Sequence, residues 1–364
     1  MILSSPPAEQ IVVPFDADRW KINAVESRVE DHLGRRSLYL KNGNAFVADA
    51  RFADGSLEFD VAFTRSRGFV GGIWRVQDAK NVEEFYLRPH QSGNPDATQY
   101  TPVFNGVSGW QLYHGERYTV AIEHRFDEWT HMKILFAGTT AEIYVGDMAK
   151  PVLVVDDLKR SIERVEAGSV GVSSGVGAPA WFSNFSFSPE APRLQARAPA
   201  ARTPPDTTPE GTIPSWQVSD VFAERDLDGR TALGPEELTG RRWTRLETES
   251  SGLANLARLN GINPVRNTVL ARKTIVSERE QIVRLDFGFS DRVRVYLNGR
   301  LLFRGADAYQ SRDYRFLGSI GYFDSLWLPL AKGGNELLMA VSEDLGGWGI
   351  QAKLEDLAGI TLKD

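Results

Sequence analysis

The chain has no cysteine among its 364 residues, which excludes disulfide bonds, thiolate metal sites and a cysteine nucleophile. It also lacks an excess of positive charge, because it has 42 Lys and Arg but 48 Asp and Glu, which gives a net charge of −6. We therefore expect no nucleic-acid partner. No apolar run reaches the ~18–20 residues that span a membrane, so no membrane span is expected.

The N-terminal residues lack the basic region and the long apolar region of a secretory signal peptide. An extracytoplasmic location stays open if a leader precedes this sequence. The oligomeric state stays open as well, because nothing in the composition bears on it.

Helical periodicity is scarce, whereas alternation of apolar and polar residues is common. Residues 57–63 place Leu57, Phe59, Val61 and Phe63 on one side of a strand. Further strands are expected at residues 118–124, 132–138, 141–147 and 150–157. Short helices are expected at 156–164 and 235–238. Short, regularly spaced strands predict an all-β sandwich or jelly-roll architecture.

The length predicts two domains. Residues 188–214 are rich in Pro, Ala, Thr and Arg and poor in large apolar residues, so they cannot form a core of their own. We predict two tandem β-sandwich or jelly-roll domains, at 1–189 and 213–364, joined by a Pro/Ala-rich linker at 190–212. Proteolysis in this linker should then give two stable fragments.

The second half contains the clearest local signal, because Asn298-Gly299 lies between two apolar runs and predicts a hairpin with a type I′ turn. The sequence "VRVYLNGRLLFRG", followed by "WLPLAKGGNELLMAV", resembles the galactose-binding-like jelly roll of sugar-binding domains attached to many glycosidases. Gly334 and Asn335 match that pattern along with the turn pair.

The first half resembles the concanavalin A-like lectin/glucanase superfamily, especially laminin-G-like modules. The phrases that carry this resemblance are "ADGSLEFDVAF", "FVGGIWRVQD", "EFYLRP", "AEIYVGD" and "AWFSNFSF". The resemblance implies a sandwich fold and a carbohydrate ligand. We therefore expect a protein that recognises a polysaccharide or glycoside through its first domain. The alternatives are a glycoside hydrolase or polysaccharide lyase acting in the same groove, or a structural module that packs against another protein.

Residues 85–115 combine hydrogen-bonding side chains with flat rings. Sugars present hydroxyl edges and apolar faces, so a sugar site needs both kinds of group. An arginine beside a histidine would also suit an acidic sugar. The structural alternative is a long ordered surface loop. The predicted ligand-binding residues are Arg75, Tyr86, Arg88, His90, Gln91, Asn94, Asp96, Tyr100, Asn105, Trp110, Gln111, Tyr113 and His114.

Catalysis in glucanases of this superfamily requires two acids on one strand. Here Glu58 and Asp60 share a face, but Ala62 stands where a second acid is needed, so the dyad is incomplete. Glu83 is a candidate carboxylate from a neighbouring strand. A lyase-type site would use His90 as the base and Tyr113 as the acid.

No cofactor and no catalytic metal are expected, because no ligand set has suitable spacing. A structural calcium remains an expectation that the family resemblance implies, with candidate ligands at Asp49, Asp54, Asp147, Asp156 and Asp157. Residues 224–236 resemble a calcium loop, but Pro235 occupies its twelfth position, so we interpret Asp228-Gly229 as a turn. His124 and His131 have no third zinc ligand and are interpreted as solvated strand residues.

Overall fold

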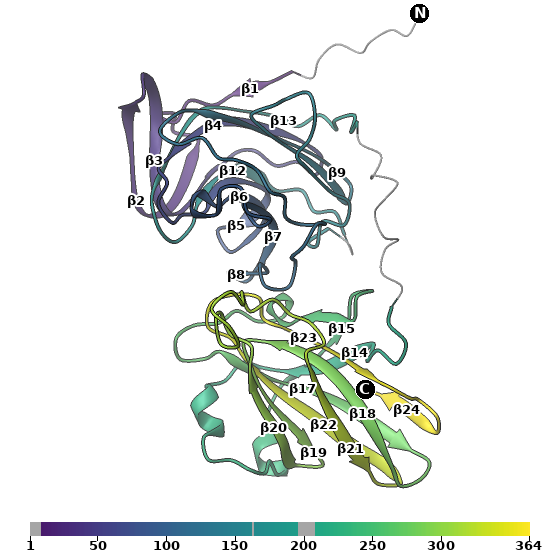
Figure 1. Ribbon diagram of the computed structural model, residues 1–364. Helices are drawn as coiled ribbons and strands as arrows, with labels where there is room; N and C mark the ends of the chain where they lie inside the picture. The colour runs from purple at the N-terminus through teal and green to yellow at the C-terminus, as the bar shows by residue number, and fades with distance from the viewer. Residues whose placement is uncertain (1–8, 162–163, 196–207) are drawn as a thin grey trace, which may run out of the picture. The chain divides into compact units, whose positions relative to one another are not determined.

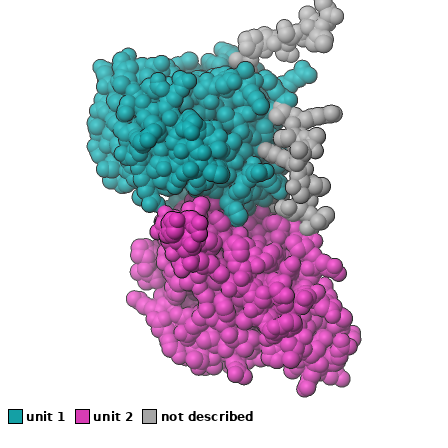
Figure 2. Space-filling view, in the orientation of Figure 1, with its two compact units in different colours: residues 1–103, 113–202 teal, residues 104–112, 203–364 magenta. Residues whose placement is uncertain are grey.

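The computed structural model describes residues 9–161, 164–195 and 208–364, and these are almost wholly β (Figure 1). The chain forms two compact units (Figure 2). Unit 1 contains residues 1–103 and 113–202, and unit 2 contains residues 104–112 and 203–364. The predicted all-β class with sandwich domains is confirmed. Residues 196–207 of the predicted linker lie outside the described residues.

Unit 1 is built on one long, curled antiparallel sheet (Figure 1). The strand order is β11-β10-β9-β4-β13-β3-β12-β5-β6-β7-β8, with β1 paired to β13 and β2 paired along β3. A short 3₁₀ helix, η1 (Pro89–Gln91), follows β6. The strands are β1 (Ile11–Val12), β2 (Trp20–His32), β3 (Arg35–Val47), β4 (Gly55–Phe63), β5 (Val70–Asp78), β6 (Asn81–Leu87), β7 (Thr98–Phe104), β8 (Val107–Ser108), β9 (Thr130–Ala137), β10 (Thr140–Val145), β11 (Leu153–Val155), β12 (Ser169–Ser174) and β13 (Ala180–Ser188).

The core of unit 1 confirms the alternation predicted for residues 57–63. Leu57, Phe59 and Val61 of β4 are completely buried. On β5, a Cβ atom at Gly72 would lie 2.9 Å from both Phe59 Cε1 and Ile134 Cδ1. The strand β5 therefore packs face to face against β4 and β9, and only glycine leaves room for this approach.

Two predictions for unit 1 are wrong. Residues 118–124 are not a strand, because the Thr98 hydroxyl accepts from Val120 N (3.1 Å) and donates to Val120 O (3.0 Å) in place of a backbone ladder. The described residues of 156–164 form turns and not a helix. Two of their backbone amides donate to side chains, as Lys159 N does to the Tyr100 hydroxyl at 2.7 Å.

Unit 2 pairs a seven-stranded sheet with a four-stranded sheet. The larger sheet has the order β15-β14-β17-β22-β19-β20, with β24 paired to β17, and the smaller has the order β16-β23-β18-β21. Its helical elements are η2 (Glu224–Leu227), α1 (Pro235–Leu238) and η3 (Leu256–Arg258). Its strands are β14 (Ser215–Ser219), β15 (Trp243–Glu247), β16 (Leu253–Asn255), β17 (Thr268–Ser277), β18 (Gln281–Ser290), β19 (Arg292–Leu297), β20 (Arg300–Ala306), β21 (Asp324–Leu330), β22 (Gly333–Ser342), β23 (Gly349–Leu354) and β24 (Ile360–Lys363).

The local signals of the second half are confirmed. Asn298 and Gly299 both have positive φ, at 50° and 79°, as a type I′ turn requires, and they join β19 to β20. The helix predicted at 235–238 is α1. The core of unit 2 joins residues of both sheets and also includes Val107, which is 3% exposed. Residues 104–112 are thus part of unit 2, which the sequence did not predict.

Within the described ranges, no helix is both long and apolar enough to cross a membrane.

Candidate functional site

Much of the predicted sugar-binding stretch is buried. Arg88 forms an ion pair with Asp96 at 3.0 Å and donates to the side-chain oxygen of Gln99. Arg75 forms an ion pair with Asp54 at 3.2 Å. These arginines tie loops to the sheet, so they do not form the exposed positive patch that an acidic sugar would need. The predicted ligand-binding residues that are less than a tenth exposed are Arg75, Tyr86, Arg88, Tyr100, Gln111 and Tyr113.

Three residues of the predicted set belong to unit 2. Asn105 Nδ2 donates to Ala257 O at 2.8 Å, and Gln111 Nε2 donates to Leu317 O at 3.2 Å. The Trp110 ring packs at 6.5 Å from the ring of Tyr309. These side chains therefore serve packing within unit 2.

The remaining predicted residues stay accessible on unit 1. Asn94 and His114 are exposed, whereas His90, Gln91 and Asp96 are half-buried. Asn94 Nδ2 donates to Gln91 Oε1 at 2.7 Å. These accessible residues remain predicted contacts for a carbohydrate ligand.

The three candidate catalytic residues have separate surroundings. Glu83 is completely buried, accepts a hydrogen bond from the Tyr100 hydroxyl at 2.7 Å, and has its pKa raised by burial. His90 packs edge-on to Phe69 at 5.4 Å, and burial lowers its pKa. Tyr113 packs against Tyr118 at 5.7 Å between ring centroids. This arrangement gives no support to a shared acid–base role.

A different group of side chains converges on the face of the unit 1 sheet that points away from the core. We call it the Asp60 cluster; its members are Arg35, Glu58, Asp60, His131, Lys133 and Asn184. The register between β4 and β9 sets Asp60 opposite His131 and Glu58 opposite Lys133. Each carboxylate of β4 thus has a cation directly across the strand pair.

The third strand of the cluster, β13, contributes through an irregularity. Its pairing with β4 shifts between Ser183 and Ser186, and Asn184 there has a φ of 52°. Asparagine tolerates this left-handed conformation. The resulting bulge directs the Asn184 side chain to Asp60.

His131 bridges the two carboxylates. Its Nδ1 lies 2.7 Å from Asp60 Oδ1, and its Nε2 lies 3.4 Å from Glu58 Oε2. The other Asp60 oxygen accepts from Arg35 Nη1 at 2.5 Å and from Asn184 Nδ2 at 2.7 Å. Lys133 Nζ lies 3.1 Å from Glu58 Oε1. Both carboxylates are therefore held in place on both oxygens.

These contacts determine the charge states in the cluster. Hydrogen bonds to Asp60 and Glu58 raise the pKa of His131 from 6.5 to about 9, so the ring is an imidazolium at neutral pH. The hydrogen bond from His131 lowers the pKa of Glu58. Burial acts to raise the pKa of Asp60, but its hydrogen bonds from His131 and Asn184 outweigh burial and the pKa is lowered. Both acids are thus ionised at neutral pH.

An aromatic rim borders the cluster. The Arg35 guanidinium lies 5.1 Å from the centroid of the Trp129 ring, and the His32 ring stacks on Trp181 at 4.0 Å. Trp129 and His131 also line a pocket of ≈ 640 Å³, together with Glu123, Arg125 and Asp147. Ser92, within the predicted stretch, donates to Glu123 at 3.1 Å, which places the accessible part of that stretch beside the pocket wall.

Of the two histidines interpreted as solvated strand residues, His124 is buried and lies outside any strand, whereas His131 is partly exposed and lies on β9. His124 is 9% exposed, and its Nε2 lies 3.0 Å from Ala97 O. His131 is the bridging residue of the Asp60 cluster. Sequence reasoning placed Glu58 and Asp60 on one face but missed His131, Trp129 and Arg35, because only the strand register brings them there.

Four of the five aspartates suggested as calcium ligands form ion pairs, and the fifth, Asp147, accepts a hydrogen bond from Ala149 N at 2.8 Å. Asp49 pairs with Arg19 at 3.0 Å, and Asp157 pairs with Arg117 at 2.8 Å. In the part of the chain that the structure describes, no three His, Asp or Glu side chains are grouped as a metal site. The structural calcium stays a prediction.

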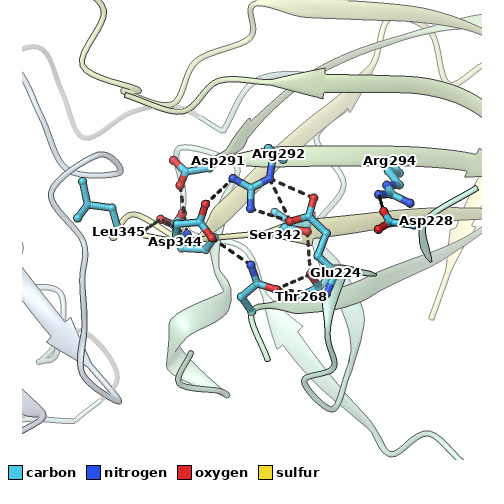
Figure 3. Close-up of polar contacts among 12 residues, drawn as sticks. Glu224, Asp228, Thr268, Asp291, Arg292, Arg294, Ser342, Asp344 and Leu345 are labelled. Carbon is cyan, nitrogen blue, oxygen red and sulfur yellow. Dashed lines mark hydrogen bonds and ion pairs between the residues drawn. The ribbon is translucent and has the colours of Figure 1, made fainter. Parts of the chain in front are cut away.

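Asp228-Gly229 forms a turn after η2, as interpreted, and two arginines of β19 pair with acids at the two ends of η2 (Figure 3). Arg292 pairs with Glu224 at 2.7 Å and with Asp344 at 2.6 Å, and Arg294 pairs with Asp228 at 2.9 Å. Glu224 and Asp228 are thus paired with cations, and Figure 3 shows both directed at these guanidinium groups.

No protein-family model matches this chain, and no curated protein matches it either. Solved structures that resemble it include carbohydrate-binding modules and glycosyl hydrolases with sandwich folds. A carbohydrate-binding module, CBM66, from Bacillus subtilis is 19% identical, with a TM-score of 0.36, over 47% of this chain and 95% of its own.

A putative glycosyl hydrolase from Parabacteroides distasonis is 16% identical, with a TM-score of 0.36, over 50% of this chain and 100% of its own. A β-glucanase from Bacillus licheniformis is 13% identical, with a TM-score of 0.33, over 52% of this chain and 100% of its own. Each likeness spans about half of this chain. The order of a concanavalin A-like domain before a galactose-binding-like domain stays a prediction.

Proposed function

We propose that this protein binds a carbohydrate through unit 1, at the Asp60 cluster and the adjoining pocket. The observation that carries the proposal is a pocket of ≈ 640 Å³ that is lined by Trp129 and by charged side chains, one of which, His131, also belongs to the Asp60 cluster. Pockets of this size suit small ligands, and sugars need both hydroxyl partners and a ring to stack on.

The charges of the site favour a saccharide without a strong net charge. Arg35, Arg125, His131 and Lys133 are balanced by Glu58, Asp60, Glu123 and Asp147. Such a balanced set offers donors and acceptors to hydroxyl groups and has no excess of either sign for an ionic ligand. The acidic-sugar hypothesis depended on Arg75 and Arg88, which are buried and paired.

Binding is favoured over glycoside hydrolysis by the protonation states. A hydrolase needs one protonated carboxylic acid and one carboxylate flanking the scissile bond. Glu58 and Asp60 both have lowered pKa values, and the next position on this face is Ala62. His131 carries a proton up to a pKa of about 9, so it is not a general base at neutral pH.

The proposal is tested with the full chain on an array of neutral and acidic glycans, followed by calorimetric titration of the strongest hit. Trp129→Ala should weaken binding by roughly tenfold, since a stacked ring contributes beyond its buried area. Trp129→Phe should retain most of the affinity because it keeps a ring.

His114→Ala is the matched control, because His114 is exposed and lies in the stretch that the sequence favoured. Its affinity should equal that of the wild type. If His114→Ala lost binding and Trp129→Ala bound normally, the binding site would lie in residues 85–115 and not at the Asp60 cluster. Equal binding in all variants, or no glycan bound at all, would refute the proposal.

A further inference from the structure

An exposed apolar strip lies on unit 2, on the outer face of its four-stranded sheet. In the described residues β21 is the last strand of that sheet. Leu328 and Leu330 of β21 point into the core, whereas the alternate residues Ser325, Trp327 and Pro329 are exposed. Trp327 is 63% exposed, which is unusual for the largest apolar side chain.

The strip extends beyond Trp327 in both directions. Ile282 of β18 pairs with Pro329 and is 67% exposed. Phe323, just before β21, is 52% exposed, and its ring lies against Gly321, where a Cβ atom would approach it to 2.5 Å. The Phe316 ring packs edge-on to Phe323 at 6.0 Å and supports it from the side.

Polar groups run along the edge of the strip. Arg284, the cross-strand partner of Trp327, pairs with Asp286 at 2.8 Å. The Ser325 hydroxyl donates to Asp286 at 2.9 Å, and Glu355 lies 4.0 Å from Arg284. Lys353 stands opposite Asp286 on β23. At the other end of the strip, Arg312 lies 5.6 Å from the centroid of the Phe323 ring and pairs with Asp324. Three cations therefore stand beside three anions, and the strip has no excess of either sign.

The two rings are four residues apart on one side of an extended chain. At ~3.3 Å per residue this separation is roughly 13 Å, longer than a single sugar ring. The strip thus offers two stacking platforms in line, with hydrogen-bonding groups between them.

We propose that this strip is a second carbohydrate-binding site, separate from the Asp60 cluster, for an extended, uncharged oligosaccharide. The apolar faces of two sugar rings stack on Trp327 and Phe323, and hydroxyls between them bind Arg284, Asp286 and Ser325. The balanced charges match an uncharged glycan and are a poor match for an anionic polymer or a phospholipid headgroup.

The test uses the full chain carrying Trp129→Ala, so that the unit 1 site is weakened and the two proposals fail independently. Calorimetric titrations use cellohexaose and xylohexaose, which are extended, and maltohexaose, which is coiled. We expect at least one extended oligosaccharide to bind, and maltohexaose to bind more weakly. Adding Trp327→Ala should weaken that binding at least tenfold, and Phe323→Ala should weaken it less.

Tyr314→Ala is the matched control, because Tyr314 is 76% exposed but lies in the loop before the strip. It should leave the affinity unchanged. The proposal is overturned if neither extended oligosaccharide binds, or if Trp327→Ala binds as tightly as its parent. It is also overturned if sedimentation equilibrium shows a dimer that Trp327→Ala dissociates, since the strip is then an interface between copies.

Discussion

Replacing His131 by glutamine removes the cation that bridges Glu58 and Asp60, and its effect depends on pH. Folding raises the pKa of His131 from 6.5 to about 9, so the folded state binds this proton more tightly than the unfolded chain does. The resulting stabilisation is complete below pH 6.5. It declines as the pH rises and is lost as the pH passes about 9.

The size of the effect follows from that shift. At ~1.4 kcal/mol per pH unit, a rise from 6.5 to about 9 corresponds to at most about 3–4 kcal/mol. The His131 side chain is 35% exposed, so solvent screening reduces the expected value to about 1–2 kcal/mol. Glu58 and Asp60 have the opposite pH dependence, because folding lowers their pKa values. Their contribution to stability is present at neutral pH and is lost as the pH falls through those lowered values.

The assay has two parts. A nuclear magnetic resonance titration of the five imidazoles should give His131 a midpoint near 9, well above an ordinary histidine. Urea unfolding at pH 6 and pH 10 should show that the wild type loses about 1–2 kcal/mol more than His131→Gln. A His131 midpoint near 6.5, or equal losses in both proteins, would refute the ion-paired cluster.

Two further predictions concern packing. Gly72→Ala should destabilise unit 1 by roughly 1–3 kcal/mol in a thermal melt, because the added Cβ would press on Phe59 and Ile134. An unchanged melting temperature would contradict the close approach of β5 to β4 and β9. Proteolytic cleavage within residues 196–207 should leave two polypeptides that co-elute on native gel filtration, because Val107 of the first polypeptide lies in the core of unit 2. Separate elution of two folded fragments would show that residues 104–112 are dispensable for unit 2.

The parts of the fold that depend on local chemistry were predictable. The apolar alternation of β4 and the Asn298-Gly299 turn each follow from a few neighbouring residues. The same holds for the short helix α1, which begins at Pro235, a residue suited to a first helical position. Segments whose backbone is held by side chains distant in the sequence were not predictable. Residues 118–124 are an example, because the Thr98 hydroxyl bonds to the backbone of Val120.

The candidate site was predictable only in part. Glu58 and Asp60 share a face by simple alternation, but their partner His131 lies 71 residues beyond Asp60 in the sequence. Its position depends on the register of β4 with β9, which a single sequence does not specify. Conversely, the polar richness of residues 85–115 resembled a binding surface, whereas Arg88 and Gln111 are used for internal hydrogen bonds.

The most direct test of the proposed function is to follow the five histidine imidazole signals while the strongest glycan hit is added to the wild-type protein. His131 lies in the Asp60 cluster and lines its pocket, whereas His90 and His114 lie in the stretch that the sequence favoured. We predict that the His131 signal shifts in proportion to bound glycan while that of His114 stays constant. Glycan binding with shifts at His90 or His114 and none at His131 would contradict it.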